Sequence, residues 1–144
     1  MKRIDARTGI EMLDEDACLR LLAAEEVGRL AVIHVTSPMI FPVNYVLEDR
    51  SIVFRTDVGT KLDHGQRSGV CFEIDAFDRP TRSGWSVVVT GRLEEITPFD
   101  SRALTEAKAL PIDPWAGGPR SHWMRILIDG ITGRRVGRSQ LTGG

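Results

Sequence analysis

The chain has 144 residues, of which 42% are hydrophobic and 27% charged, and its formal net charge is -1. These values are typical of one soluble globular domain, spanning residues 1–144, with a core of its own. The near-neutral charge gives no reason to expect binding to nucleic acid or to an anionic membrane. No apolar run approaches the ~20 residues of a membrane span, and residues 1–13 mix both signs of charge, unlike a signal peptide.

The cysteines and histidines do not follow a metal-binding pattern. Cys18 and Cys71 lie outside any C-x-x-C motif, and the three histidines are isolated from one another. Two thiols cannot complete a tetrahedral zinc site without partners, so we expect no metal. Two unpaired thiols also fit a reducing compartment, and we expect a cytoplasmic protein.

The first half of the chain predicts one helix followed by strands. Asp14 can cap a helix that opens near Leu13, and Gly28 can end it. Runs of apolar and β-branched residues then predict strands at 29–35, 40–47, 51–56 and 69–75. Between the last two, we expect a loop at 57–59 and a short helix over 61–68.

The second half predicts a polar loop over 76–84 and a long strand over 85–96, in which Gly91 marks a bulge or bend. Thr97 is expected to cap a second helix that runs to about Leu110, followed by a loop over 112–121. Segments 122–128 and 131–136 are predicted to form a last hairpin across Asp129 and Gly130.

These elements favour a mainly β fold with attached helices. The prediction contains six or seven strands and two main helices, and the strands follow one another as antiparallel neighbours. Alternating βαβ units are absent from the pattern, which argues against a doubly wound sheet. We therefore expect an antiparallel β-barrel with helices on its outside.

Segment 54–61 (FRTDVGTK) carries the most informative chemistry. A strand ends there, hydroxyls and cations follow, and Gly59 permits a tight turn before a helix begins. Arg55, Thr56, Thr60 and Lys61 are residue types that bind phosphate together with the free amides of a helix start. The alternative is an ordinary strand–loop–helix junction with a solvated lysine, and the residue types alone favour that alternative.

An ordered set of segments resembles the FMN-binding split β-barrel family of pyridoxamine 5′-phosphate oxidase. Segment 54–61 resembles the FMN-phosphate loop of that family, and residues 42–45 (PVNY) resemble its second strand, which lines the isoalloxazine ring. Residues 83–91 (SGWSVVVTG) resemble the later strand that contacts the ring. Further matches are residues 26–31 (EVGRLA) at the entry to the first strand and 132–135 (TGRR) near the end.

The resemblance implies a split β-barrel that forms a homodimer with FMN between the protomers. It implies that the phosphate is bound by Arg55, Thr56, Thr60 and Lys61. It implies that the ring is bordered by Pro42, Val43, Asn44, Tyr45, Trp85, Ser86 and Val87. The true oxidases also hold phosphate with an Arg and a Lys on the second strand, which this chain lacks, and we expect Arg55 to replace that charge.

The resemblance further implies an FMN-dependent oxidoreductase that acts on a small molecule by hydride transfer through flavin N5, with no dedicated acid or base. Two alternatives stay open. A related split barrel would bind the deazaflavin F420, whose longer tail would use Lys61, Arg67 and Arg125. The third possibility is a module that binds a flavin or haem without turnover.

Overall fold

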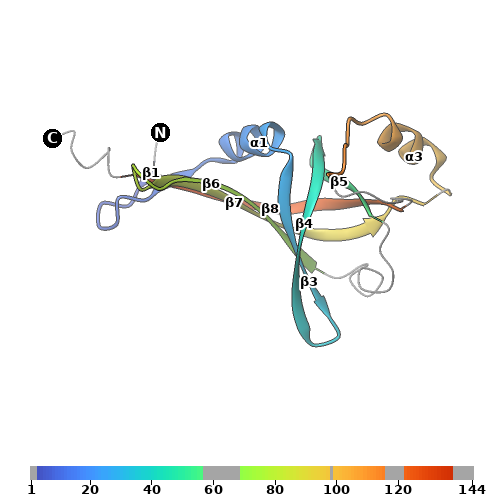
Figure 1. The fold of residues 1–144 in the computed structure, drawn as a ribbon, viewed down its shortest axis with the longest axis horizontal. Helices are drawn as coiled ribbons and strands as arrows, with labels where there is room; N and C mark the ends of the chain where they lie inside the picture. The colour runs from blue at the N-terminus through green and yellow to red at the C-terminus, as the bar shows by residue number, and fades with distance from the viewer. Residues whose placement is uncertain (1–2, 57–68, 98, 116–121, 138–144) are drawn as a thin grey trace.

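The computed structural model describes residues 3–56, 69–97, 99–115 and 122–137 (Figure 1). In chain order the elements are β1 (Arg3–Ile4), β2 (Glu11–Leu13), α1 (Glu15–Ala24), β3 (Val27–His34), β4 (Ser37–Glu48), β5 (Ser51–Thr56), β6 (Gly69–Asp78), β7 (Ser83–Glu95), α3 (Ser101–Lys108) and β8 (His122–Val136). No helix among these residues is long and apolar enough to cross a membrane.

The strands form one antiparallel sheet that closes on itself. Its order is β1-β2-β8-β5-β4-β3-β6-β7, and β7 pairs with β8 as well. Six strands therefore form a barrel, which confirms the predicted mainly β fold with attached helices. The long β8 makes this closure possible, because one of its edges pairs with β7 while the other pairs first with β5 and then with β2.

Two hydrophobic clusters hold the helices against the barrel. The larger one fills the barrel interior, with side chains such as Leu30, Phe54 and Phe72 fully buried, and α1 adds Cys18 and Leu22 to it. The smaller cluster lies under α3 and consists of Val53, Ile96, Ala107 and Trp123. β5 contributes to both clusters, because successive side chains of a strand point to opposite faces: Phe54 joins the larger cluster and Val53 the smaller one.

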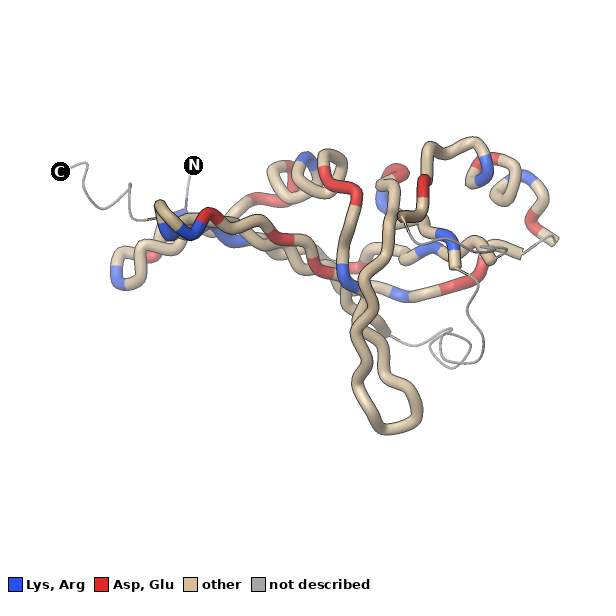
Figure 2. Tube along the Cα trace, in the orientation of Figure 1, with Lys and Arg blue, Asp and Glu red and all other residues tan. Residues whose placement is uncertain are grey.

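The β3–β4 hairpin extends away from the rest of the sheet (Figure 1). β3 pairs with β6 only from Arg29 to Ala31, whereas it pairs with β4 along its whole length. No Lys, Arg, Asp or Glu lies on the projecting part of this hairpin (Figure 2). Residues 31–40, at the end of this hairpin, therefore form a charge-free arm beside the barrel.

The predicted hairpin across Asp129 and Gly130 is wrong, because β8 runs through these residues as one strand. The register shifts there, since Thr90 faces Gly130 while Gly91 faces Ile128. Asp129 is thus the extra residue of a bulge, and the bulge predicted at Gly91 is confirmed. A Cβ on Gly91 would lie 2.3 Å from the Leu127 carbonyl oxygen, so this close crossing requires glycine.

The start of α1 was predicted correctly, whereas the end of α1 and the cap of α3 were not. The Asp14 cap is confirmed, because its Oδ1 accepts a hydrogen bond of 2.8 Å from the Ala17 amide. The role predicted for Gly28 is wrong: α1 ends at Ala24, and Gly28 lies buried in β3. Thr97 is also not the cap of the second helix, since the Asp100 side chain accepts a hydrogen bond from the Ala103 amide and α3 begins one residue later.

Strand bounds differ mostly by extension. β5 has the predicted bounds, but the predicted loop over 76–84 shrinks to a short turn because β6 runs to Asp78 and β7 begins at Ser83. The short strands β1 and β2 were not predicted, and with them the described part of the chain has eight strands. The predicted loop over 57–59, the helix over 61–68 and part of the loop over 112–121 lie outside the described residues.

Candidate functional site

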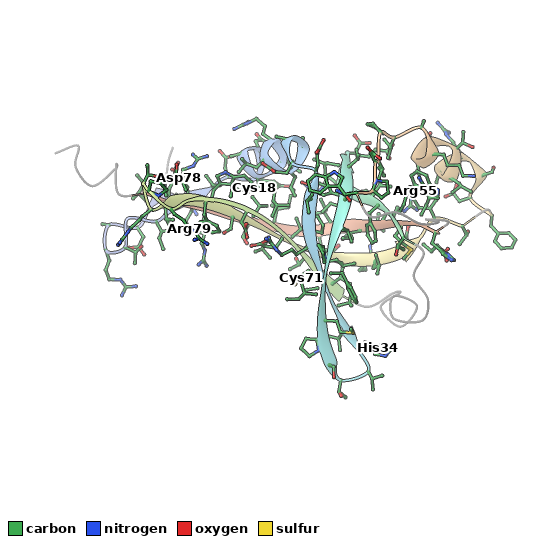
Figure 3. All side chains as sticks on the ribbon, viewed as in Figure 1. Cys18, His34, Arg55, Cys71, Asp78 and Arg79 are labelled. Atoms are coloured by element: carbon green, nitrogen blue, oxygen red, sulfur yellow. The ribbon has the colours of Figure 1, made fainter. Side chains whose placement is uncertain are left out.

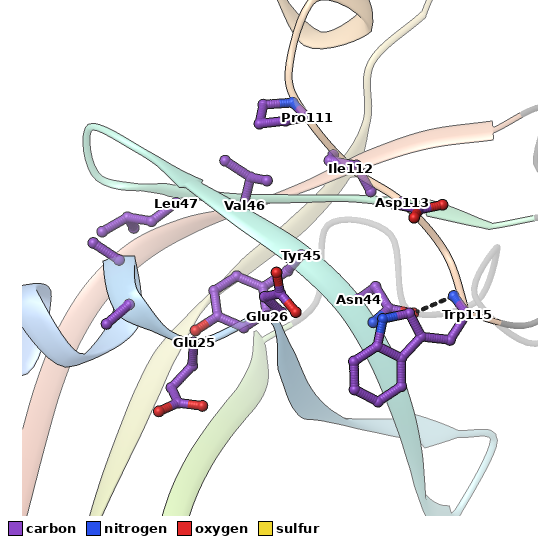
Figure 4. A pocket seen from close by; sticks show the side chains of 12 residues that line it. Glu25, Glu26, Asn44, Tyr45, Val46, Leu47, Pro111, Ile112, Asp113 and Trp115 are labelled. Atoms are coloured by element: carbon purple, nitrogen blue, oxygen red, sulfur yellow. Dashed lines mark hydrogen bonds between the residues drawn. The ribbon is translucent and has the colours of Figure 1, made fainter.

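A pocket of about 380 Å³ opens beside β4, between the end of α1 and the segment that follows α3 (Figure 4). Residues from all three parts line it, among them Glu25, Glu26, Asn44, Tyr45, Asp113 and Trp115. The described lining residues include three carboxylates and no Lys or Arg. The pocket thus disfavours a phosphate and suits a neutral or cationic group.

The predicted ring-binding residues of β4 lie on two different faces of the strand, because successive side chains alternate. Val43 and Tyr45 pack toward the barrel interior, and Pro42 and Asn44 occupy the alternate positions on the outer face. The Asn44 Oδ1 accepts a hydrogen bond of 2.9 Å from the Trp115 amide, so Asn44 fastens the segment after α3 to the strand (Figure 4). The Trp115 side chain remains 73% exposed beside it.

Tyr45 belongs to the core as much as to the pocket. Its side chain is 3% exposed, and its ring meets Phe72 edge to face with centroids 4.9 Å apart. Its hydroxyl donates a hydrogen bond of 2.7 Å to the Leu22 carbonyl in the last turn of α1. Burial, and then the charge of Glu25, raise the pKa of this phenol above its ordinary range.

The end of β5 supplies the cationic part of the site. Arg55 and Thr56 face Trp123 and His122 of β8 in the sheet register, and the Arg55 guanidinium lies 4.9 Å from the Trp123 ring centroid. Because Tyr45 pairs with Phe54, the next residue of β5 lies level with Asn44. Arg55 and Asn44 thus each adjoin the last paired residues of the two strands, Phe54 and Tyr45. Figure 3 places Arg55 on the side of the molecule that carries α3.

Thr60 and Lys61, the other two predicted phosphate ligands, lie outside the described residues. Thr56 is 7% exposed, and so its side chain is largely enclosed. The role of these three residues stays a prediction.

The predicted residues of β7 divide between the main core and the outer face, as those of β4 do. Trp85 is half-buried against the main core and Val87 is fully buried in it, whereas Ser86 lies opposite Asp75 of β6. Two strands, β3 and β6, separate β7 from β4 along the sheet. At about 4.8 Å per strand spacing this is roughly 14 Å. The separation along the sheet applies to the outer-face residues Pro42, Asn44 and Ser86, whereas Val43, Tyr45, Trp85 and Val87 all pack in or against the main core.

A polar network that the sequence did not predict lies between Pro42 of β4 and Ser86 of β7. The Arg29 Nη1 donates to Glu73 Oε1 at 2.9 Å and to Asp75 Oδ2 at 3.1 Å. Burial, and then the hydrogen bond and charge of Asp75, raise the pKa of Glu73, although Arg29 opposes this shift. The only sequence signal was the Glu-x-Asp spacing in β6, which places both carboxylates on one face of a strand.

A profile of the pyridoxamine 5′-phosphate oxidase family matches residues 14–135. The chain belongs to this family. An uncharacterized protein of Mycobacterium tuberculosis is 33% identical to it over 137 residues, which cover 91% of this chain and 88% of that protein.

Solved structures extend the family likeness to three dimensions. A FAD binding protein from Mycobacterium smegmatis is 34% identical with a TM-score of 0.73, over 88% of this chain and 97% of that chain. A conserved protein of unknown function from Corynebacterium diphtheriae is 33% identical with a TM-score of 0.72, over 87% and 96% of the two chains. The family fold therefore spans nearly the whole of each relative.

Proposed function

We propose that this protein binds a flavin nucleotide, FMN in the first instance, on the outer face of β4 and β5, and that it is an oxidoreductase. The observation that supports this most is that Arg55 directly follows Phe54, the partner of Tyr45, so that the strand next to one wall of the pocket carries a cation. The Mycobacterium smegmatis relative, a FAD binding protein, supports a flavin as the ligand.

The charges of the site suggest which end of the flavin lies where. Arg55 would bind the phosphate together with Thr56, Thr60 and Lys61, because a guanidinium and an ammonium suit a phosphate dianion. The ring would lie against the outer face of β4, near Pro42 and Asn44. A bound flavin supplies hydride transfer, and the chain's own residues need only position it and exclude water.

We propose that the complete site needs a second copy of the chain. Two strands separate β7 from β4 along the sheet of one protomer. A two-fold related copy would bring Trp85 of one protomer to the outer β4 face of the other. The charge-free arm supports such an assembly, since Ile33, Val35 and Ile40 are 60%, 77% and 68% exposed.

A mixing experiment tests this shared site. Arg55→Glu and Trp85→Ala variants should each bind FMN weakly, because each lacks one half of every site. After the two are mixed and allowed to exchange subunits, about a quarter of all sites regain both residues, and tight binding should reappear at that level. A mixture that binds no better than its two components would contradict a site shared between protomers.

Lys61→Ala tests the phosphate assignment. A charge-assisted contact is worth about 1.5–3 kcal/mol, so the Kd for FMN should rise roughly tenfold to a hundredfold. Riboflavin lacks the phosphate and should respond little. Equal weakening of both ligands would mean that Lys61 supports the loop without contacting phosphate, and an unchanged FMN affinity would refute the assignment.

FAD is a second candidate because the Mycobacterium smegmatis relative is a FAD binding protein. Parallel titrations with FMN, FAD and F420 separate the three, and FMN should bind most tightly. Reduction of the bound flavin by NADH or NADPH then separates an enzyme from a binding module. If only F420 binds, the cofactor proposal is wrong while the fold assignment stands.

A further inference from the structure

The pocket beside β4 has the size of a site for a small molecule. Its volume of about 380 Å³ lies near the lower end of the range of about 300–1,000 Å³ that ligand pockets span. Three separate parts of the chain build it, namely the end of α1, β4 and the segment after α3 (Figure 4). Asn44 belongs both to this pocket and to the outer face of β4, so the pocket adjoins the position proposed for the flavin ring.

The pocket combines an apolar lining with an acidic one. The apolar side chains come from β4 and from the segment after α3, with Val46, Leu47, Pro111 and Ile112. The carboxylates come from two different parts of the chain, Glu25 and Glu26 after α1 and Asp113 after α3. None of the described lining residues is Lys or Arg. An anionic ligand would therefore meet like charges here, whereas a cation would be attracted.

The end of α1 adds to the negative potential of the pocket. Ala23 and Ala24, the last two residues of the helix, both line the pocket. The carboxyl end of a helix carries a partial negative charge, which comes from its last carbonyl groups. No Lys or Arg lies in the last turn of α1 to offset that charge. The helix dipole and the carboxylates thus favour a ligand of the same sign.

The charge of Glu25 acts on Tyr45, which also lines the pocket. Burial, and then this charge, raise the pKa of the Tyr45 phenol. The hydroxyl hydrogen of Tyr45 is already donated to the Leu22 carbonyl, so it is not available to an anionic ligand. Tyr45 therefore supplies ring surface to the pocket and no donor.

Trp115 adds an aromatic side chain to the lining. The residue is 73% exposed, yet its backbone amide is fixed to β4 by the hydrogen bond of 2.9 Å to Asn44 Oδ1 (Figure 4). The face of an indole ring attracts ammonium groups, and Trp is the strongest of the aromatic residues in this respect. An aromatic residue held beside an acidic cavity is suited to binding an organic cation.

We propose that this pocket receives the cationic end of the substrate, an ammonium group on a compact apolar body. The ammonium lies among the three carboxylates and beside the Trp115 indole, and the apolar body packs against Val46 and Ile112. The inference rests on the proposed function, because the flavin ring on the outer face of β4 would lie next to the bound molecule. The substrate class is thus a small organic amine or quaternary ammonium compound, which neutral and anionic compounds of the same shape do not replace.

Three probes of similar shape and different charge test this selectivity: benzylammonium, benzyl alcohol and benzoate. NMR titration of the ¹⁵N-labelled full chain, followed at the amide and indole signals of Trp115, gives a Kd for each probe. With or without FMN, benzylammonium should bind about threefold to tenfold more tightly than benzyl alcohol, and benzoate should bind most weakly. Salt at about 1 M should weaken the binding of benzylammonium and leave that of benzyl alcohol unchanged.

Substitutions then assign the selectivity to this pocket. The double variant Glu25→Gln, Glu26→Gln should weaken benzylammonium binding by roughly threefold to tenfold without affecting benzyl alcohol. Trp115→Leu should weaken benzylammonium binding by about twofold to fivefold. Asp16→Asn is the matched control, because it removes one carboxylate at the opposite end of α1, and it should change neither Kd.

The outcomes separate this inference from the proposed function. Equal binding of benzylammonium and benzyl alcohol, or an unchanged benzylammonium Kd in the double variant, would overturn the inference. Displacement of benzylammonium by FMN would show that the flavin itself occupies the pocket, which overturns the inference and leaves the proposed function intact. Failure of FMN to bind would contradict the proposed function, whereas titration of the FMN-free chain would still decide whether the pocket selects cations.

Discussion

Replacing Tyr45 by Phe should destabilise the protein through one hydroxyl group. The phenol is buried and donates to the Leu22 carbonyl, which lies in the last turn of α1 and has no amide four residues ahead to satisfy it within the helix. Phe keeps the edge-to-face contact with Phe72 and loses only the hydrogen bond. The free energy of unfolding should fall by about 1–2 kcal/mol, which corresponds to a decrease in Tm of about 3–6 °C.

Urea unfolding of the two proteins at neutral pH measures this difference in the free energy of unfolding. Repeating the measurement at higher pH tests whether the phenol proton contributes to it. Because the folded state holds the phenol proton more tightly than the unfolded chain, ionisation of Tyr45 lowers stability as the pH rises above about 10. The advantage of wild type over Tyr45→Phe should therefore shrink there. Tyr45 is the single tyrosine of the chain, so tyrosinate absorbance reports on it alone.

The same variant also separates fold from site. Since the hydroxyl is engaged by Leu22, FMN affinity should change little in Tyr45→Phe. A loss of stability below about 0.3 kcal/mol would refute the reasoning, because a satisfied buried hydrogen bond contributes more than that. A large loss of FMN affinity with unchanged stability would instead place the hydroxyl on the ligand.

Two further predictions follow from close packing. Gly28→Ala should cost about 1–3 kcal/mol, because the new Cβ would lie 2.1 Å from the buried ring of Phe72; Gly69→Ala, with nothing within 4 Å, is the matched control, and equal Tm values for the two variants would contradict the packing argument. Cys18 is fully buried, and its burial together with nearby carboxylates raises the pKa of its thiol. In a Cys71→Ser background, no thiol should react with Ellman's reagent until the protein unfolds, and rapid reaction of the native variant would show that α1 opens readily.

Local signals in the sequence predicted the elements that local forces determine. The apolar run of β5 and the Asp14 cap were read correctly, because alternation and side-chain capping act within a few residues. The Asp129-Gly130 pair was misread, since this pair favours a turn in isolation and only the pairing of β8 with β7 turns it into a bulge. Gly28 was misread for a similar reason: its requirement for glycine comes from Phe72, which is distant in sequence.

In the candidate site, too, local features were predictable from the sequence and features that depend on distant strand pairing were not. The sequence placed Asn44 and Arg55 correctly on adjoining strands, because a short turn joins β4 to β5. It did not reveal that Arg29 meets Glu73 and Asp75, since 44 and 46 residues separate them and only the β3–β6 register brings them together. The two strands that separate β7 from β4 along the sheet likewise follow from the order of the strands, which the sequence does not reveal.

The absorption spectrum of the freshly purified protein, followed by identification of any released chromophore, tests the central proposal most directly. We expect a flavin spectrum and FMN on release, or the appearance of that bound spectrum when apo-protein is mixed with FMN. A deazaflavin or haem spectrum, or no spectral change at high micromolar FMN, would contradict the proposal that this barrel holds a flavin nucleotide.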